Sequence, residues 1–100
     1  MGKTMTLQIE RMITFDGKGT LKAFCDLSID GTFLIRGVRV VEGKQGLFVS
    51  MPRQQGKDSK WYDIVRAMTR EAKEEMTRVV LEAYQHDVAS HVDEEATLTP

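Results

Sequence analysis

The apolar residues of this chain recur with two different periods, and this change constrains the fold more than any other feature of the sequence. From Leu7 to Met51 apolar residues alternate with polar ones, which is the pattern of half-buried β-strands. From about residue 68 they recur every three or four residues instead, which is typical of one face of an α-helix. We therefore predict an α+β domain in which one long C-terminal helix packs on a β-sheet.

Turn residues divide the alternating half into four strands. Residues 16–19 separate strand 7–15 from strand 21–29, and Asp30-Gly31 predicts a tight turn into residues 32–41. Residues 42–46 lead into Leu47–Met51, and Pro52 ends this strand because it cannot donate to a ladder. In the first strand, the alternation places these residues on one face: Leu7, Ile9, Ile13 and Phe15.

The alternation breaks within the third strand. Ile35 would share a face with Phe33 but not with Val38, unless Gly37 lies in a β-bulge. Such a bulge would bring Arg36 and Arg39 together on the outer face, either as phosphate contacts or as solvated charges. Phe24 and Phe48 are also expected to point outward, opposite the helix. We predict that these two phenylalanines lie in a dimer interface, because dimerisation would help so small a domain to bury apolar surface.

The segment between the fourth strand and the helix is polar at first and then aromatic. Residues 53–60 predict a loop, and residues 61–68 predict a short fifth strand. Trp61 is interpreted as a core residue, and stacking of Trp61 and Tyr62 on unpaired bases is the alternative. Thr69 is the expected N-cap of the helix. The apolar stripe of the helix is expected to consist of Met68, Ala72, Met76, Val79, Val80 and Ala83.

The end of the chain loses this stripe and becomes acidic. Residues 87–100 contain four carboxylates and no apolar period, which predicts a fraying helix end and a disordered tail. One hundred residues suffice for one core but not for two. We therefore expect a single domain over residues 1–86 and an acidic tail over residues 87–100.

Candidate catalytic and metal-binding residues are few. Cys25 occupies an inward strand position and is interpreted as a structural residue, and His86 and His91 are five residues apart without a further ligand. We expect no catalysis, no cofactor, no metal and no small-molecule substrate. A single cysteine, no apolar run of about 20 residues and no signal peptide predict a cytoplasmic protein that does not bind membranes.

The charge distribution is uneven along the chain. Residues 1–66 contain eleven Lys and Arg against seven Asp and Glu, a net charge of +4. Residues 67–100 contain three against eight, a net charge of −5. A basic first part with an acidic end is compatible with an anion-binding surface and equally with a solvated one.

Two stretches of the sequence resemble the SpoVG family, the stage V sporulation protein G or septation regulators of bacteria. They are Val38-Arg39-Val40-Val41-Glu42-Gly43 and Gly46-Leu47-Phe48-Val49-Ser50-Met51-Pro52, and the similarity continues through Tyr62-Asp63-Ile64-Val65 to Tyr84. The resemblance covers about residues 7–85. It implies a meander of four to five strands with a C-terminal helix, assembled as a homodimer. It also implies site-preferring binding of DNA, possibly RNA, that regulates gene expression and influences septation or sporulation.

The resemblance also points to basic residues early in the helix. Lys73 matches a basic family position, whereas Glu75 lies where some members have a second basic residue. Arg70, Glu74, Arg78 and Glu82 follow at steps of four and predict a self-neutralising ladder of ion pairs. The preferred candidates for nucleic-acid binding are Arg66 and Lys73, which stand outside this ladder, followed by the loop residues Arg53, Lys57 and Lys60. The further candidates are Arg70, Arg39 and Arg36.

A function from a different class stays open. The sequence pI near 6.1, the acid at Glu75 and the acidic tail are also compatible with a non-enzymatic protein-interaction adaptor that has little affinity for nucleic acid. Measured binding as a function of salt separates the two, because phosphate contacts make log affinity fall linearly with log salt.

Overall fold

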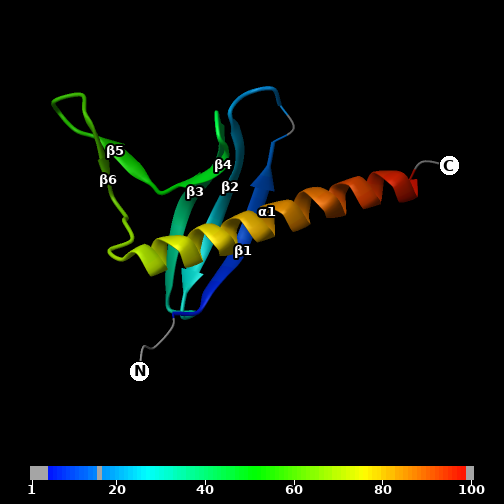
Figure 1. The fold of residues 1–100 in the computed structure, drawn as a ribbon, viewed down its shortest axis with the longest axis horizontal. Coiled ribbons are helices and arrows are strands. Elements are labelled where there is room, and N and C mark those ends of the chain that lie inside the picture. Colours follow the sequence, from blue (N-terminus) through cyan, green and yellow to red (C-terminus); the bar gives the residue numbers. More distant parts are fainter. Residues whose placement is uncertain (1–4, 16, 99–100) are drawn as a thin grey trace.

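The computed structural model describes residues 5–15 and 17–98, with side chains up to Ala89. Four strands, β1 (Leu7–Thr14), β2 (Leu21–Ile29), β3 (Phe33–Gly43) and β4 (Gly46–Ser50), pair antiparallel in the order β1-β2-β3-β4. One helix, α1 (Arg70–Leu98), crosses one face of this sheet (Figure 1). The predicted α+β meander with a C-terminal helix is therefore confirmed.

The core lies between this face of the sheet and α1. Alternate residues of β2 and β3 point toward the helix, which presents Met76 and Val80 one turn apart. Leu7, Ile9 and Met12 of β1 pack against this core from the sheet edge. The buried apolar residues are Ala23, Cys25, Leu27, Val38, Val40, Met76 and Val80.

Of the two alternatives that the sequence leaves open for the third strand, the structure has the bulge at Gly37. Cys25 pairs with Val38 and Leu27 pairs with Ile35, so β3 contains one more residue than β2 between these pairs. Gly37 has φ +83°, a left-handed value that glycine adopts without a Cβ clash. The extra residue shifts the phase of the strand, and both Ile35 and Val38 consequently face the helix.

A second bulge, in β1, makes the predicted face of Ile13 and Phe15 wrong. The register shifts between Ile9 and Arg11, so Met12 rather than Ile13 joins Leu7 and Ile9 at the core. Ile13 is 39% exposed and Phe15 is 38% exposed, and Ile13 pairs with Phe24 on the outer face. The alternation of the sequence could not reveal this shift, because no glycine marks it.

Residues 53–63 form a hairpin, where the sequence predicts a loop over residues 53–60 and a short fifth strand over residues 61–68. β5 (Arg53–Gln55) pairs antiparallel with β6 (Trp61–Asp63) in a separate two-stranded sheet. We call residues 53–63 the arm, because the hairpin projects from the main sheet (Figure 1). β6 ends at Asp63, since residues 64–69 turn the chain into the helix.

The helix begins where the sequence predicts. The Thr69 Oγ1 accepts a hydrogen bond from the Ala72 N–H at 3.1 Å, as an N-cap does. Met68 precedes this cap and is 92% exposed, so its predicted place in the apolar stripe is wrong. The helix continues to Leu98, through most of the segment for which the sequence predicts disorder. The domain boundary at residue 86 stays a prediction, and residues 99–100 lie outside the described residues.

The outer face of the sheet has no described element packed on it. Register places Ile13, Phe24, Arg39 and Ser50 in one row across the four strands, on the side opposite the core. Phe48 lies on the same face because it pairs with Val41, two residues after Arg39. The predicted outward orientation of Phe24 and Phe48 agrees with this register.

Candidate nucleic-acid interface

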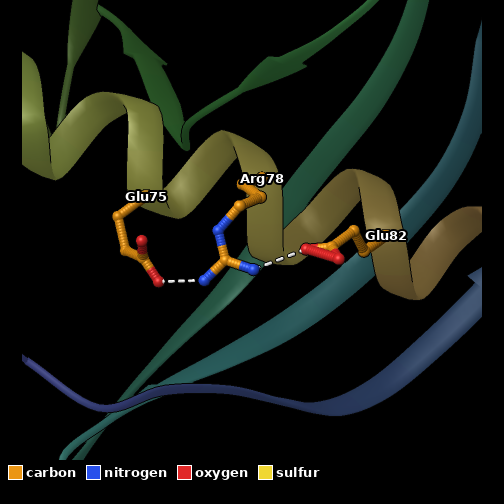
Figure 2. A network of polar contacts seen from close by, with 3 residues as sticks. All are labelled: Glu75, Arg78 and Glu82. Atoms are coloured by element: carbon orange, nitrogen blue, oxygen red, sulfur yellow. Dashed lines mark hydrogen bonds and ion pairs between the residues drawn. The ribbon is translucent and has the colours of Figure 1, made fainter.

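Most cations on the surface of α1 are held by neighbouring carboxylates. The Arg70 Nε lies 3.1 Å from the Glu74 Oε1, one turn further along the helix. Figure 2 shows the Arg78 guanidinium between two carboxylates, with its Nη2 bonded to Glu75 and its Nη1 2.6 Å from the Glu82 Oε2. These carboxylates raise the pKa of Arg78. The alternating ladder of the sequence therefore forms two closed groups of ion pairs.

Lys73 lies among these residues but has no such partner. Its side chain is exposed and forms no ion pair within the described part of the chain. Arg70, Lys73, Thr77 and Arg78 border one shallow depression on the helix surface. Lys73 is thus the cation of this surface whose charge is not offset by a bonded carboxylate.

Arg66 lies between the arm and α1. Its side chain is exposed and borders a groove whose walls are mainly apolar, near the first turn of the helix. The arm and the N-terminal end of α1 lie on the same side of the molecule (Figure 1). Arg66 therefore connects the basic residues of the arm with Lys73 along the chain.

The arm contains three of the candidate cations. Arg53 is paired with Asp63 across the hairpin, with its Nε 3.3 Å from the Asp63 Oδ1. Lys57 and Lys60 are exposed and form no ion pair among the described residues. Two of the three arm cations therefore retain an uncompensated charge.

The tip of the arm is held by local hydrogen bonds. The Tyr62 hydroxyl donates to the Asp58 Oδ2 at 2.5 Å, which lowers the pKa of Asp58 and raises that of Tyr62. The Lys60 N–H donates to the Asp58 Oδ1, and the Gly56 N–H donates to the Lys60 carbonyl. The backbone that carries Lys57 and Lys60 thus has a defined conformation.

The outer-face candidates lie around Phe24. The Arg39 guanidinium stands 5.5 Å from the centre of the Phe24 ring, and the Phe15 ring meets that ring edge-on at 5.5 Å. Arg36 and Phe24 border a common depression, so the bulge at Gly37 does bring Arg36 and Arg39 to one face. Phe48 is 48% exposed on that face.

Trp61 is not a core residue, and its interpretation as one is wrong. Its side chain is 57% exposed because β6 belongs to the projecting arm rather than to the main sheet. Trp61 borders a depression together with Arg39, Ser50, Met51 and Arg53. The signal in the sequence was the position of Trp61 directly after the polar residues 53–60.

Cys25 is the one cysteine of the sequence, and its side chain is buried in the core. Burial raises the pKa of the Cys25 thiol to about 11, and Asp26 adds to this effect. Among residues 5–15 and 17–89, no three His, Cys, Asp or Glu side chains lie close enough to bind one metal ion. Within the described residues no helix has the length and apolar character needed to cross a bilayer.

Comparison with the sequences of known proteins places this chain in a family. The SpoVG family model matches residues 5–86. A septation protein SpoVG of Archaeoglobus fulgidus is 40% identical over 75 residues, which are 75% of this chain and 88% of that protein. One of Heliobacterium modesticaldum is 34% identical over 88% of this chain and 99% of its own length, and one of Lachnospira eligens is 31% identical over 77% and 85%. The match spans the sheet, the arm and the start of the helix, and the chain belongs to the SpoVG family.

Proposed function

We propose that this chain is a nucleic-acid-binding regulatory protein that contacts phosphates through the arm and the N-terminal end of α1. One observation carries the proposal: four exposed cations of this region form no ion pair with any described residue. We call these four residues the basic end. They are Lys57, Lys60, Arg66 and Lys73.

The distinction between free and paired cations has a physical basis. A free lysine or arginine that neutralises a phosphate releases condensed counterions from the nucleic acid, which favours binding at low salt. Arg78 must first exchange two carboxylates for a phosphate, and Arg70 must exchange one. The basic end is therefore expected to supply most of the electrostatic affinity, and the ladder on α1 little of it.

The regulatory part of the proposal is supported by the family. The relatives are named septation proteins, and the SpoVG resemblance implies control of gene expression through sites on DNA, possibly RNA. Residues 67–100 carry a net charge of −5, and this negative charge opposes non-specific attraction to phosphate. Moderate affinity with a preference for particular sites is the expected outcome.

Three substitutions, each of which removes one positive charge, test which cations contact phosphates. Lys73→Ala and Arg66→Ala are each expected to weaken binding several-fold and to lower the salt slope by about one unit for each phosphate that is no longer neutralised. Arg78→Ala is the matched control: it removes the same charge but no free cation, so its effect should be smaller. Fluorescence anisotropy with labelled DNA and RNA at two salt concentrations measures both quantities.

Two results would contradict this proposal. Equal weakening at all three positions would mean that net charge matters and contact geometry does not. Absence of binding to every DNA and RNA probe at low salt would exclude nucleic-acid binding altogether. Thermal melting of each variant controls for folding, and exposed charges are expected to change stability by less than about 1 kcal/mol.

The adaptor function has one specific observation in its favour. Ile64 is 60% exposed and Met68 is 92% exposed in the segment between the arm and α1. Apolar side chains that cluster at the surface are typical of protein-binding sites. An adaptor would bind no nucleic acid at low salt, and Ile64→Asp or Met68→Asp would abolish binding of its protein partner.

A further inference from the structure

The depression between the arm and the outer face of the sheet combines two kinds of group that fit one ligand. Trp61 supplies an exposed indole from β6, and Arg39 and Arg53 supply guanidinium groups from β3 and β5. Ser50 adds a hydroxyl group opposite Arg39 in the ladder between β3 and β4. We infer that this depression binds one unpaired nucleotide of a single-stranded nucleic acid, with its base on Trp61 and its phosphate on Arg39.

The arrangement of the arm presents Trp61 to this depression. Successive strand residues point to opposite faces, so Trp61 and Asp63 share one face of the hairpin and Tyr62 lies on the other. Arg53 pairs with Asp63 on the Trp61 face. On the other face of the hairpin, the Tyr62 ring lies so near Gly56 that a Cβ there would come within 2.8 Å of it.

The charges of the depression favour a phosphate. Arg39 forms no ion pair within the described residues, its guanidinium lies 5.5 Å from the centre of the Phe24 ring, and its side chain borders the depression. Arg53 is paired with the carboxylate of Asp63. Two arginines and one carboxylate give these three side chains a net charge of +1. A phosphate diester carries one negative charge and accepts hydrogen bonds from guanidinium forks.

The exposed indole favours a base that is not paired. Every base has a π-face that stacks on an aromatic ring, but in a duplex both faces of each base are already stacked on neighbours. Stacking on the Trp61 ring alone would not distinguish bases, so we expect little sequence preference at this position. This inference rests on the proposed nucleic-acid binding and adds its single-strand component.

The test uses the full chain and its only tryptophan. Twelve-residue oligothymidylate and oligouridylate are titrated at low salt, and a twelve-base-pair duplex serves as the comparison probe. We expect saturable quenching of Trp61 emission by the single strands and little quenching by the duplex. Labelled versions of the same probes give affinities by anisotropy.

Substitutions make the test specific. Trp61→Ala is expected to weaken single-strand binding about tenfold and duplex binding far less, and Trp61→Phe to retain part of the affinity. Arg39→Ala should weaken single-strand binding and reduce the quenching. Phe33→Ala is the matched control, since Phe33 is 70% exposed on the same sheet but six residues before Arg39 in β3.

The outcomes distinguish a failure of the nucleotide site from a failure of the proposed nucleic-acid binding. Single-strand binding by anisotropy with unchanged Trp61 emission, and with Trp61→Ala equal to wild type, overturns the nucleotide site but leaves nucleic-acid binding intact. Binding of the duplex but not of the single strands would likewise overturn the nucleotide site and leave nucleic-acid binding intact. Absence of binding to all probes overturns both. Protection of Trp61 from acrylamide in the free protein also overturns the site, because a partner subunit would then cover it.

Discussion

Arg70 and Arg78 each have a glutamate four residues later in α1, whereas Lys73 has threonines four residues away on both sides. The same helix therefore carries paired and unpaired cations within three turns. Because a paired guanidinium must lose its carboxylate before it binds a phosphate, the local neighbours decide which cation contributes to an interface. At this scale, the proposed phosphate contacts depend on the spacing of cations and carboxylates rather than on the number of basic residues.

Cys25 allows a prediction at the same scale. The thiol is 2% exposed and its pKa is raised to about 11, so only about one thiol in a thousand is ionised at pH 8. We expect negligible reaction with a disulfide reagent such as DTNB in the native protein and complete reaction in guanidinium chloride. Rapid reaction of the native protein would mean that β2 opens easily or that the thiol is accessible.

The raised pKa of Cys25 also gives a stability profile. Because the folded-state pKa lies above the ordinary value of 9.0, ionisation favours the unfolded chain at high pH. The contribution of the neutral thiol is present below pH 9 and is lost as the pH rises through about 11. Melting temperatures from about pH 8 to about pH 11 measure this loss, and Cys25→Ala should show a smaller decrease over that interval.

Three register shifts, one in each of β1, β2 and β3, determine which side chains these strands present to each face. The bulge at Gly37 lets both halves of β3 face the helix, and the shift after Ile9 moves Ile13 to the outer face. Strand pairing in the arm similarly decides that Trp61 and Arg53 share one face. At the scale of elements, register therefore builds the outer face, because each extra residue exchanges the two sides of the strand.

Substitution of Gly37 tests the role of its backbone conformation. A Cβ at Gly37 would meet no atom within 4 Å, so the cost of Gly37→Ala arises from the φ of +83° alone. We expect a loss of about 1 to 2 kcal/mol in the free energy of unfolding, measured with urea. Gly19→Ala is the control, because that site is equally open and has no positive φ. Equal stability of Gly37→Ala and wild type would show that the bulge tolerates alanine.

The molecule has a larger radius of gyration than a compact domain of the same length. Its radius of gyration is 15.4 Å, against about 13 Å for a compact domain of this size, because the arm and the end of α1 extend beyond the sheet (Figure 1). One sheet face packs against α1, and the outer face carries Phe24 and Phe48. An open aromatic face on so small a domain favours association.

This shape supports the prediction of a homodimer. We expect light scattering to give twice the chain mass at micromolar concentration, and Phe48→Glu to give the monomer mass. Phe33→Glu is the control, because Phe33 is exposed at the start of β3 and lies outside the proposed interface. A wild-type monomer at this concentration, or a Phe48→Glu variant that remains dimeric, would contradict an interface centred on Phe24 and Phe48.

The amino-acid sequence alone determined the architecture of this protein. The periods of two and 3.6, the turn at Asp30-Gly31, the bulge at Gly37 and the cap at Thr69 are local features, and each was predicted because it depends on neighbours within a few residues. The ion pairs of Arg70 and Arg78 were predicted for the same reason, since a helix fixes the distance between residues four apart.

Only the tertiary structure decided which residues meet at the outer face. The register shift in β1 has no glycine to announce it, and the short β5 and β6 form a hairpin of their own instead of joining the main sheet. Arg39 belongs to β3 and Arg53 and Trp61 belong to the arm, yet all three border one depression. Such contacts depend on how whole elements pack, and the free energy that favours one packing is spread over many residues that no local pattern contains.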